Sequence, residues 1–133
     1  MNLIEIDKSL PFGFHDAVLN KIDIDYEKGE AVFDLEIIND PDTWEYRRGK
    51  LFLYGLVFLV VEPPDDRSGF NDKVLYIGSG PITDLNEKQK NSLPVQHLPE
   101  GAFVHWFYIS AWNSFIFFSA LTAEFTFELG REK

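Results

Sequence analysis

The sequence predicts a small domain of mainly antiparallel β-strands, arranged as a two-layer sandwich or a curled, barrel-like sheet of about seven or eight strands. Segments with alternating apolar and polar residues recur along the 133-residue chain. Aromatic side chains, which favour strands, make up 16% of the residues. Because no segment keeps a helical period for more than about two turns, we expect at most one short helix, near residues 85–92.

The first element is a hairpin over residues 17–38, in which both arms alternate. Lys28-Gly29 is suited to a two-residue turn between the arms. With that turn the apolar faces of the two arms coincide, and Asp23 lies opposite Asp34 on the polar face.

The later elements are strands separated by turn residues. Gly78-Ser79-Gly80 is interpreted as a turn. The most apolar strand follows the loop at residues 39–42, and it is expected to be central because both of its faces are apolar. The strands after the hairpin are expected at residues 47–62, 72–78, 102–112, 115–120 and 121–129.

Composition narrows the class of protein. No linker or repeat divides residues 1–133, so we expect a single β domain. The net charge of −10 disfavours nucleic acids and anionic membranes as partners. The chain contains no cysteine, which excludes disulfides and thiolate catalysis, and the absence of a signal-peptide pattern points to the cytoplasm.

Four acidic side chains share the polar face of the first hairpin: Asp23, Asp25, Asp34 and Glu36. Like charges directly opposite each other cost up to roughly 1 kcal/mol. Such a cost suggests a basic partner or a bound cation, and the alternative is a solvated face with Lys21 as relief. We take these four residues as a candidate partner-binding surface.

A second candidate is a polar site of His15, Asp16 and His105, which would suit a metal-dependent hydrolase if the three side chains converged. Neighbouring residues of a strand point to opposite faces, which argues against a joint role for the first two. No H-E-x-x-H, G-x-S-x-G or phosphate-loop motif is present. We therefore expect no metal, no cofactor and no catalytic residue, and the sequence favours a protein that is not an enzyme.

Tryptophans Trp44, Trp106 and Trp112 suggest a third candidate, a stacking surface for a sugar or another small ligand. Alternation places Trp106, Trp112 and Tyr108 on one face of a strand. Such residues more often belong to a core. A ligand-binding role requires Trp106 and Tyr108 to line an open groove.

The segment Phe14-His15-Asp16-Ala17, followed by Ile22-Asp23-Ile24-Asp25-Tyr26, resembles the opening of small, uncharacterised bacterial proteins. Some of those proteins are similar to immunity proteins of polymorphic toxin systems, which neutralise a cognate toxin. The resemblance covers about the first forty residues and, more faintly, residues 51–57. It implies a class of protein and carries over no catalytic residues.

These observations lead to a non-enzymatic binding protein, monomeric or homodimeric, as the first hypothesis. It would act as an immunity protein whose acidic face occludes a basic toxin. The alternatives are the small-ligand or carbohydrate-binding domain and the metal-dependent hydrolase described above.

Overall fold

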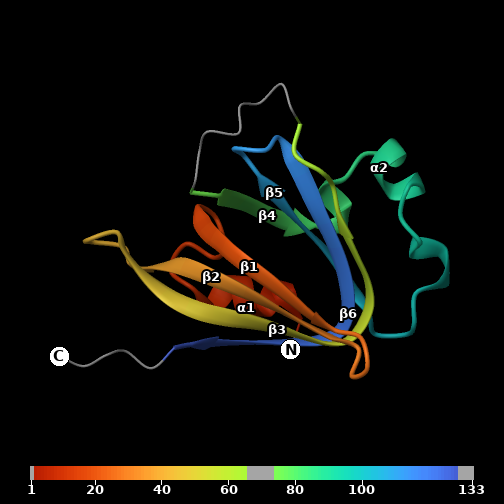
Figure 1. The fold of residues 1–133 in the computed structure, drawn as a ribbon, viewed down its shortest axis with the longest axis horizontal. Helices are drawn as coiled ribbons and strands as arrows, with labels where there is room; N and C mark the ends of the chain where they lie inside the picture. Colours follow the sequence, from red (N-terminus) through yellow and green to blue (C-terminus); the bar gives the residue numbers. More distant parts are fainter. Residues whose placement is uncertain (1, 66–73, 129–133) are drawn as a thin grey trace.

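The computed structural model describes residues 2–65 and 74–128, and within them six strands form a closed antiparallel barrel (Figure 1). The order around the barrel is β1-β2-β3-β6-β5-β4. This confirms the all-β prediction in its barrel-like form, with fewer strands than expected. The strands are β1 (Ala17–Asp25), β2 (Glu30–Asp40), β3 (Glu45–Val61), β4 (Tyr76–Pro81), β5 (Phe103–Ile109) and β6 (Ser114–Phe127).

The strand count is lower because β6 is continuous where two strands were predicted, at residues 115–120 and 121–129. Its residues that pack into the barrel core are even-numbered up to Ala120 and odd-numbered from Ala123 onward. Strand β3 makes a similar change at Gly55: Leu51 and Leu53 face the core before this glycine, and Leu56 faces it afterwards. Gly55 has a φ of 65°, and its position faces Leu121. Such a switch in a paired strand bends the sheet into a barrel, and in the sequence it resembles a strand boundary.

The first hairpin has a different register from the predicted one. Residues 26–29 form the turn, so that Asp25 pairs with Glu30 and Lys21 pairs with Asp34. The longer turn is stabilised because the Lys28 amide donates a hydrogen bond of 3.1 Å to the Asp25 carboxylate. The predicted two-residue turn, and with it the direct pairing of Asp23 with Asp34, is therefore wrong.

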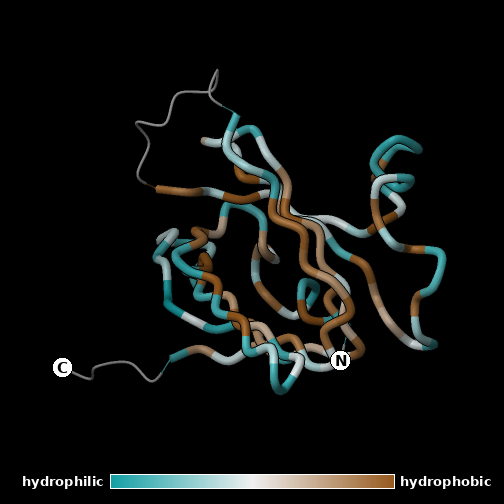
Figure 2. Tube along the Cα trace, turned by 45° about the vertical axis from the view of Figure 1, so that its right-hand side comes forward, coloured by the Kyte–Doolittle hydropathy of each residue, from teal (hydrophilic) through white to brown (hydrophobic). Residues whose placement is uncertain are grey.

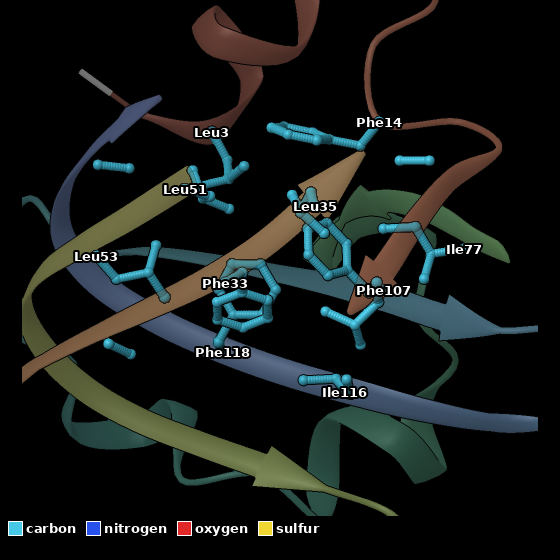
Figure 3. Close-up of a cluster of buried hydrophobic side chains, with 14 of the residues drawn as sticks. Leu3, Phe14, Phe33, Leu35, Leu51, Leu53, Ile77, Phe107, Ile116 and Phe118 are labelled. Atoms are coloured by element: carbon cyan, nitrogen blue, oxygen red, sulfur yellow. The ribbon is translucent and has the colours of Figure 1, made fainter. Parts of the chain in front are cut away.

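The apolar side chains that point into the barrel form one core, drawn in Figure 3. At its centre the rings of Phe33, Phe107 and Phe118 lie with their centroids 5.0 to 5.5 Å apart. Leu51 and Leu53 of β3 add to this core. Large rings at tilted and edge-on angles bury much area and interact favourably with each other, which explains the high aromatic content.

Helix α1 (Leu3–Ser9) was not predicted. The Asn2 side chain accepts a hydrogen bond of 2.9 Å from the Glu5 amide, and the Glu5 carboxylate accepts one of 3.0 Å from the Asn2 amide. This capping box starts the helix, and burial of Leu3 and Ile6 in the core holds it in place. A helix of this length is not stable on its propensity alone, so the sequence shows only a weak period.

A short layer outside the barrel consists of η1 (Ile82–Asp84), α2 (Glu87–Asn91) and η2 (Val95–His97) (Figure 1). Figure 2 shows hydrophobic stretches along this segment as well as along the strands. Leu85 and Leu93 pack on Phe117 of β6, with Phe58 of β3 against the same cluster. This layer confirms a helix near residues 85–92, and it packs against β3 at Phe58.

Strand β4 begins later than predicted and runs through Gly78-Ser79-Gly80. These residues pair with Trp106 to Tyr108 of β5, so their interpretation as a turn is wrong. Residues 72 and 73 of the predicted strand lie outside the described residues. Across residues 2–65 and 74–128, no helix is long and apolar enough to cross a bilayer.

Candidate functional site

The four carboxylates of the first hairpin lie on the outer side of β1 and β2, but basic neighbours separate them. Lys21 Nζ is 3.4 Å from the Asp23 carboxylate. Lys50 Nζ is 3.6 Å from Asp34 Oδ1, which makes no hydrogen bond. Because Asp34 pairs with Lys21 on one side and Lys50 on the other, the like-charge contact that suggested a partner does not form.

The two remaining carboxylates of this face also have local contacts. The Asn20 carboxamide donates a hydrogen bond of 2.9 Å to Glu36, and Asp25 accepts the turn hydrogen bond from Lys28. Each acidic side chain of the candidate surface thus has its own partner within the hairpin or on β3. The surface is of mixed charge, and a cluster of uncompensated negative charge is not present on it.

The structure does not bring His15, Asp16 and His105 together. His15 Nε2 lies 3.5 Å from Asp16 Oδ2, and both side chains are exposed, at 75% and 55%. His105 is only 3% exposed and points into the barrel. In the part of the chain that the structure describes, no three His, Asp or Glu side chains form a group that could hold a metal ion.

His105 forms a polar pair with Ser79 inside the apolar barrel. Its Nε2 lies 2.6 Å from Ser79 Oγ, and the rings of Phe107 and Phe118 lie beside the imidazole. Burial lowers the pKa of His105 to about 4, so the ring is neutral at pH 7. Among the described residues no carboxylate hydrogen bonds to this imidazole, so the pair lacks the acid that orients the base in a catalytic triad.

The outer surface of β4, β5 and β6 carries a pocket of about 390 Å³, which we call the aromatic pocket. It opens to solvent beside η1 and α2. The described residues that line it are Gly78, Asp84, Leu85, Gln89, Trp106, Tyr108 and Phe115.

Strand alternation explains why this pocket forms. His105 and Phe107 point into the barrel, so Trp106 and Tyr108 point outward. On the neighbouring strand Gly80 pairs with Trp106, and Gly78 pairs with Tyr108. A Cβ atom on Gly80 would lie 2.4 Å from Trp106 Cζ2, so the indole rests directly on the backbone of β4.

The two outward rings are held by hydrogen bonds at their polar atoms. Trp106 Nε1 donates a bond of 2.9 Å to the Pro81 carbonyl oxygen. The Tyr108 hydroxyl donates to the Asn113 carboxamide oxygen, and that carboxamide donates a bond of 3.2 Å to Asp65. The rings therefore have fixed positions before any ligand arrives, and the part of each ring left for a ligand is carbon.

The Phe115 ring lies at a large angle to each of the other two rings. The Phe115 ring is inclined at 73° to Trp106, with centroids 5.7 Å apart, and at 55° to Tyr108, with centroids 4.9 Å apart. Phe115 thus forms a corner with each of the other two rings, and the three rings do not form one flat platform.

Asp84 and Gln89 are the polar side chains of the pocket lining. Gln89 Oε1 already accepts a hydrogen bond of 2.9 Å from the Asn86 amide, which caps α2. Asp84 makes no hydrogen bond or ion pair with the described part of the chain, and its Oδ2 lies 2.4 Å from the position that a Cβ of Gly80 would occupy. One unpaired carboxylate thus lies beside the Trp106 ring.

Sequence reasoning found part of this site. It placed Trp106 and Tyr108 on one face, and both line an open pocket as the ligand-binding hypothesis requires. Trp112, expected on the same face, packs against the core instead, and Trp44 stacks on Phe12 with centroids 5.0 Å apart.

Sequence reasoning missed Asp84, Gln89, Phe115 and the two glycines. The available signal was Gly-x-Gly within a possible strand, since glycine there often marks close approach of another group. The sequence alone did not show which aromatic side chain approaches the glycines.

Comparison with known proteins does not place this chain in a family. No known protein family, no curated protein and no solved structure matches this chain.

Proposed function

We propose that this protein binds a small organic ligand in the aromatic pocket. The observation that carries the proposal is that Trp106 and Tyr108 line an open pocket of about 390 Å³. Ligand sites are commonly concave, mostly apolar, and about 300 to 1,000 Å³ in volume, with a few well-placed polar groups. This pocket has each of these properties.

The support for binding includes preorganisation. Hydrogen bonds to Pro81 and Asn113 already orient the Trp106 and Tyr108 rings. A ligand that meets rigid side chains loses less free energy to ordering, so more of the contact energy appears as affinity.

The residues of the pocket favour binding over catalysis. Its described lining holds one carboxylate and no histidine or hydroxyl nucleophile other than the hydrogen-bonded Tyr108 phenol. Ser79 and His105 belong to the opposite, inward side of β4 and β5. General acid-base or nucleophilic chemistry needs such groups within hydrogen-bond reach of the substrate.

The experiment is a fragment screen read by the ¹H–¹⁵N signal of the Trp106 indole, assigned with the Trp106→Phe variant. We expect fragments with an apolar or aromatic-stacking face to shift this signal. Gly78→Val should weaken their binding because it fills the pocket, while Trp44→Ala, which alters an exposed ring elsewhere, should not. If no fragment shifted the Trp106 signal, the proposal would be wrong.

A second proposal is the docking of a basic protein, such as a toxin, on the outer face of β1 and β2. Exposed Asp23 and Asp25 and the net charge of −10 support it, and the compensation by Lys21 and Lys50 weakens it. A partner captured from the native host should be released by added salt. Its association should slow when Asp23 and Asp25 are both replaced by lysine, and indifference to these changes would contradict this proposal.

A further inference from the structure

We infer that the aromatic pocket selects a methylated ammonium cation, a ligand whose nitrogen carries methyl groups and a permanent or near-permanent positive charge. This inference rests on the proposed function, and it names the chemical class of the ligand. The shape of the pocket, the state of its polar atoms and its charge support it independently.

The shape fits a rounded group. Phe115 is inclined at 73° to Trp106 and at 55° to Tyr108, so Phe115 forms a corner with each of the two other rings of the open pocket. A sugar ring stacks best on a broad flat aromatic surface, and the corners that Phe115 makes with the other two rings interrupt such a surface. A trimethylammonium group is nearly spherical, and each ring can attract it through the negative charge of its π face.

Three polar atoms of the walls are already occupied. Trp106 Nε1 donates to Pro81, the Tyr108 hydroxyl donates to Asn113, and Gln89 Oε1 accepts from Asn86. A sugar would bring several hydroxyl groups that lose water and find few partners here besides the Asp84 carboxylate, which costs free energy. A quaternary ammonium group has no N–H donor, so it needs none of these partners.

The charge of the pocket is negative. Asp84 is unpaired within the described chain and lies beside the Trp106 ring, and no lysine or arginine is among the described lining residues. Lys88 and Lys90 of the adjacent helix are not part of that lining. A carboxylate next to aromatic walls attracts a cation twice, through its charge and through the rings, and the net charge of −10 favours its approach.

Gly80 allows this arrangement. A Cβ at this position would lie 2.4 Å from both Asp84 Oδ2 and Trp106 Cζ2. Only a residue without a side chain lets the carboxylate and the indole meet over the same point of β4. The carboxylate and the ring are thus placed to contact the same bound group.

The test is a titration of the full chain with three probes, followed by the Trp106 indole signal. Choline carries the methylated cation, 3,3-dimethylbutan-1-ol is its neutral carbon isostere, and methyl β-glucoside is a sugar. We expect choline to bind at least about tenfold more tightly than either neutral probe.

The matched variants are Asp84→Asn and Glu87→Gln. Asp84→Asn should weaken choline binding about tenfold and leave the neutral alcohol unchanged, because it removes charge and little volume. Glu87→Gln removes a carboxylate of α2 outside the described pocket lining, and it should leave choline binding unchanged. Circular dichroism of each variant confirms that it is folded.

A fourth probe, Nα-acetyl-trimethyllysine methylamide, separates the two sources of such a cation. Tighter binding of this probe than of choline would indicate a modified lysine side chain, and the reverse would indicate a free small molecule; both results support the inference. Equal or tighter binding of the alcohol or the glucoside would overturn it while leaving the proposed function intact. If the four probes and the fragment library all failed to shift the Trp106 signal, this inference and the proposal of a small organic ligand would both be wrong.

Discussion

Ser79 Oγ lies 2.6 Å from His105 Nε2 inside a barrel whose described core is mostly apolar side chains. The imidazole is 3% exposed, and its surroundings include the edges and faces of two phenylalanine rings. Such a site favours the neutral ring, because a buried charge loses its water without gaining a counterion.

The first prediction is a loss of stability in acid that depends on His105. Its folded pKa of about 4 lies below the ordinary value of 6.5, so below about pH 6.5 the unfolded chain binds a proton that the folded chain does not. Above pH 6.5 the ring is neutral in both states, so its titration does not lower the free energy of unfolding. As the pH drops from 6.5 to about 4, this titration lowers the free energy of unfolding by about 3 kcal/mol.

Urea unfolding at pH 7, 5.5 and 4.5 measures this effect, with His105→Gln compared against the wild type. The stability difference between the two proteins should change with pH, since the variant lacks the titrating group. The exposed-histidine variant His15→Gln is the control, and it should follow the wild type. A difference that stayed constant over this range would contradict the low pKa.

The second prediction concerns the partner of that histidine. Ser79→Ala removes the hydroxyl and leaves the buried Nε2 atom without its hydrogen bond, which should lower the free energy of unfolding by about 1 to 3 kcal/mol. Ser119→Ala is a matched control, because its Oγ is buried with no hydrogen-bond partner. Removing that hydroxyl should be neutral or stabilising in urea unfolding, and an equal loss from both changes would rule out a special role for the Ser79 contact.

The third prediction compares the two glycines of β4. Gly80→Ala should lower the melting temperature and displace the Trp106 indole signal, because the new methyl would lie 2.4 Å from the ring and from Asp84. Overpacking of this kind costs about 1 to 3 kcal/mol. Gly78→Ala places its methyl 4.0 Å from Trp106, an ordinary contact. Its melting temperature should stay near that of the wild type, and equal effects of the two substitutions would argue against the close packing of Trp106 on Gly80.

The fourth prediction tests the register of the first hairpin. Asp34 pairs with Lys21 and lies 3.6 Å from Lys50 Nζ. Asp34→Lys would place three positive charges together and should destabilise the protein by about 1 kcal/mol or less, since the site is partly exposed. In the register with Asp23 opposite Asp34, the same change would create an ion pair and stabilise. The sign of the change in urea unfolding therefore distinguishes the two registers, with Asp34→Asn as the charge-neutral comparison.

Several parts of the fold follow from local pattern. Alternation identifies the arms of the first hairpin, and the long apolar run identifies β3 as a strand, although only its inward residues are buried. The capping residue Asn86 begins α2 within the predicted helix near residues 85–92. These features depend on residues close together in the chain, so periodicity and turn chemistry suffice to detect them.

Other parts depend on contacts that local pattern does not contain. The turn at residues 26–29 shifts the hairpin by two residues, and that shift exchanges Asp23 for Lys21 as the neighbour of Asp34. Helix α1 has little intrinsic stability and exists because Leu3 and Ile6 are buried by strands far along the chain. The bend at Gly55 and Leu121 likewise becomes visible only when β3 and β6 are paired.

The aromatic pocket shows most directly which features the local sequence determines and which depend on the tertiary structure. Alternation within β5 was enough to set Trp106 and Tyr108 on one face, since that is a property of neighbouring residues in a strand. The pairing of β4 with β5 decided whether this face belongs to the core or to the surface. The same pairing brings Gly80 and Asp84 to the Trp106 indole. That pairing joins residues more than twenty positions apart, and its energy comes from closing the barrel around a shared apolar core, a global property that no short stretch of sequence carries.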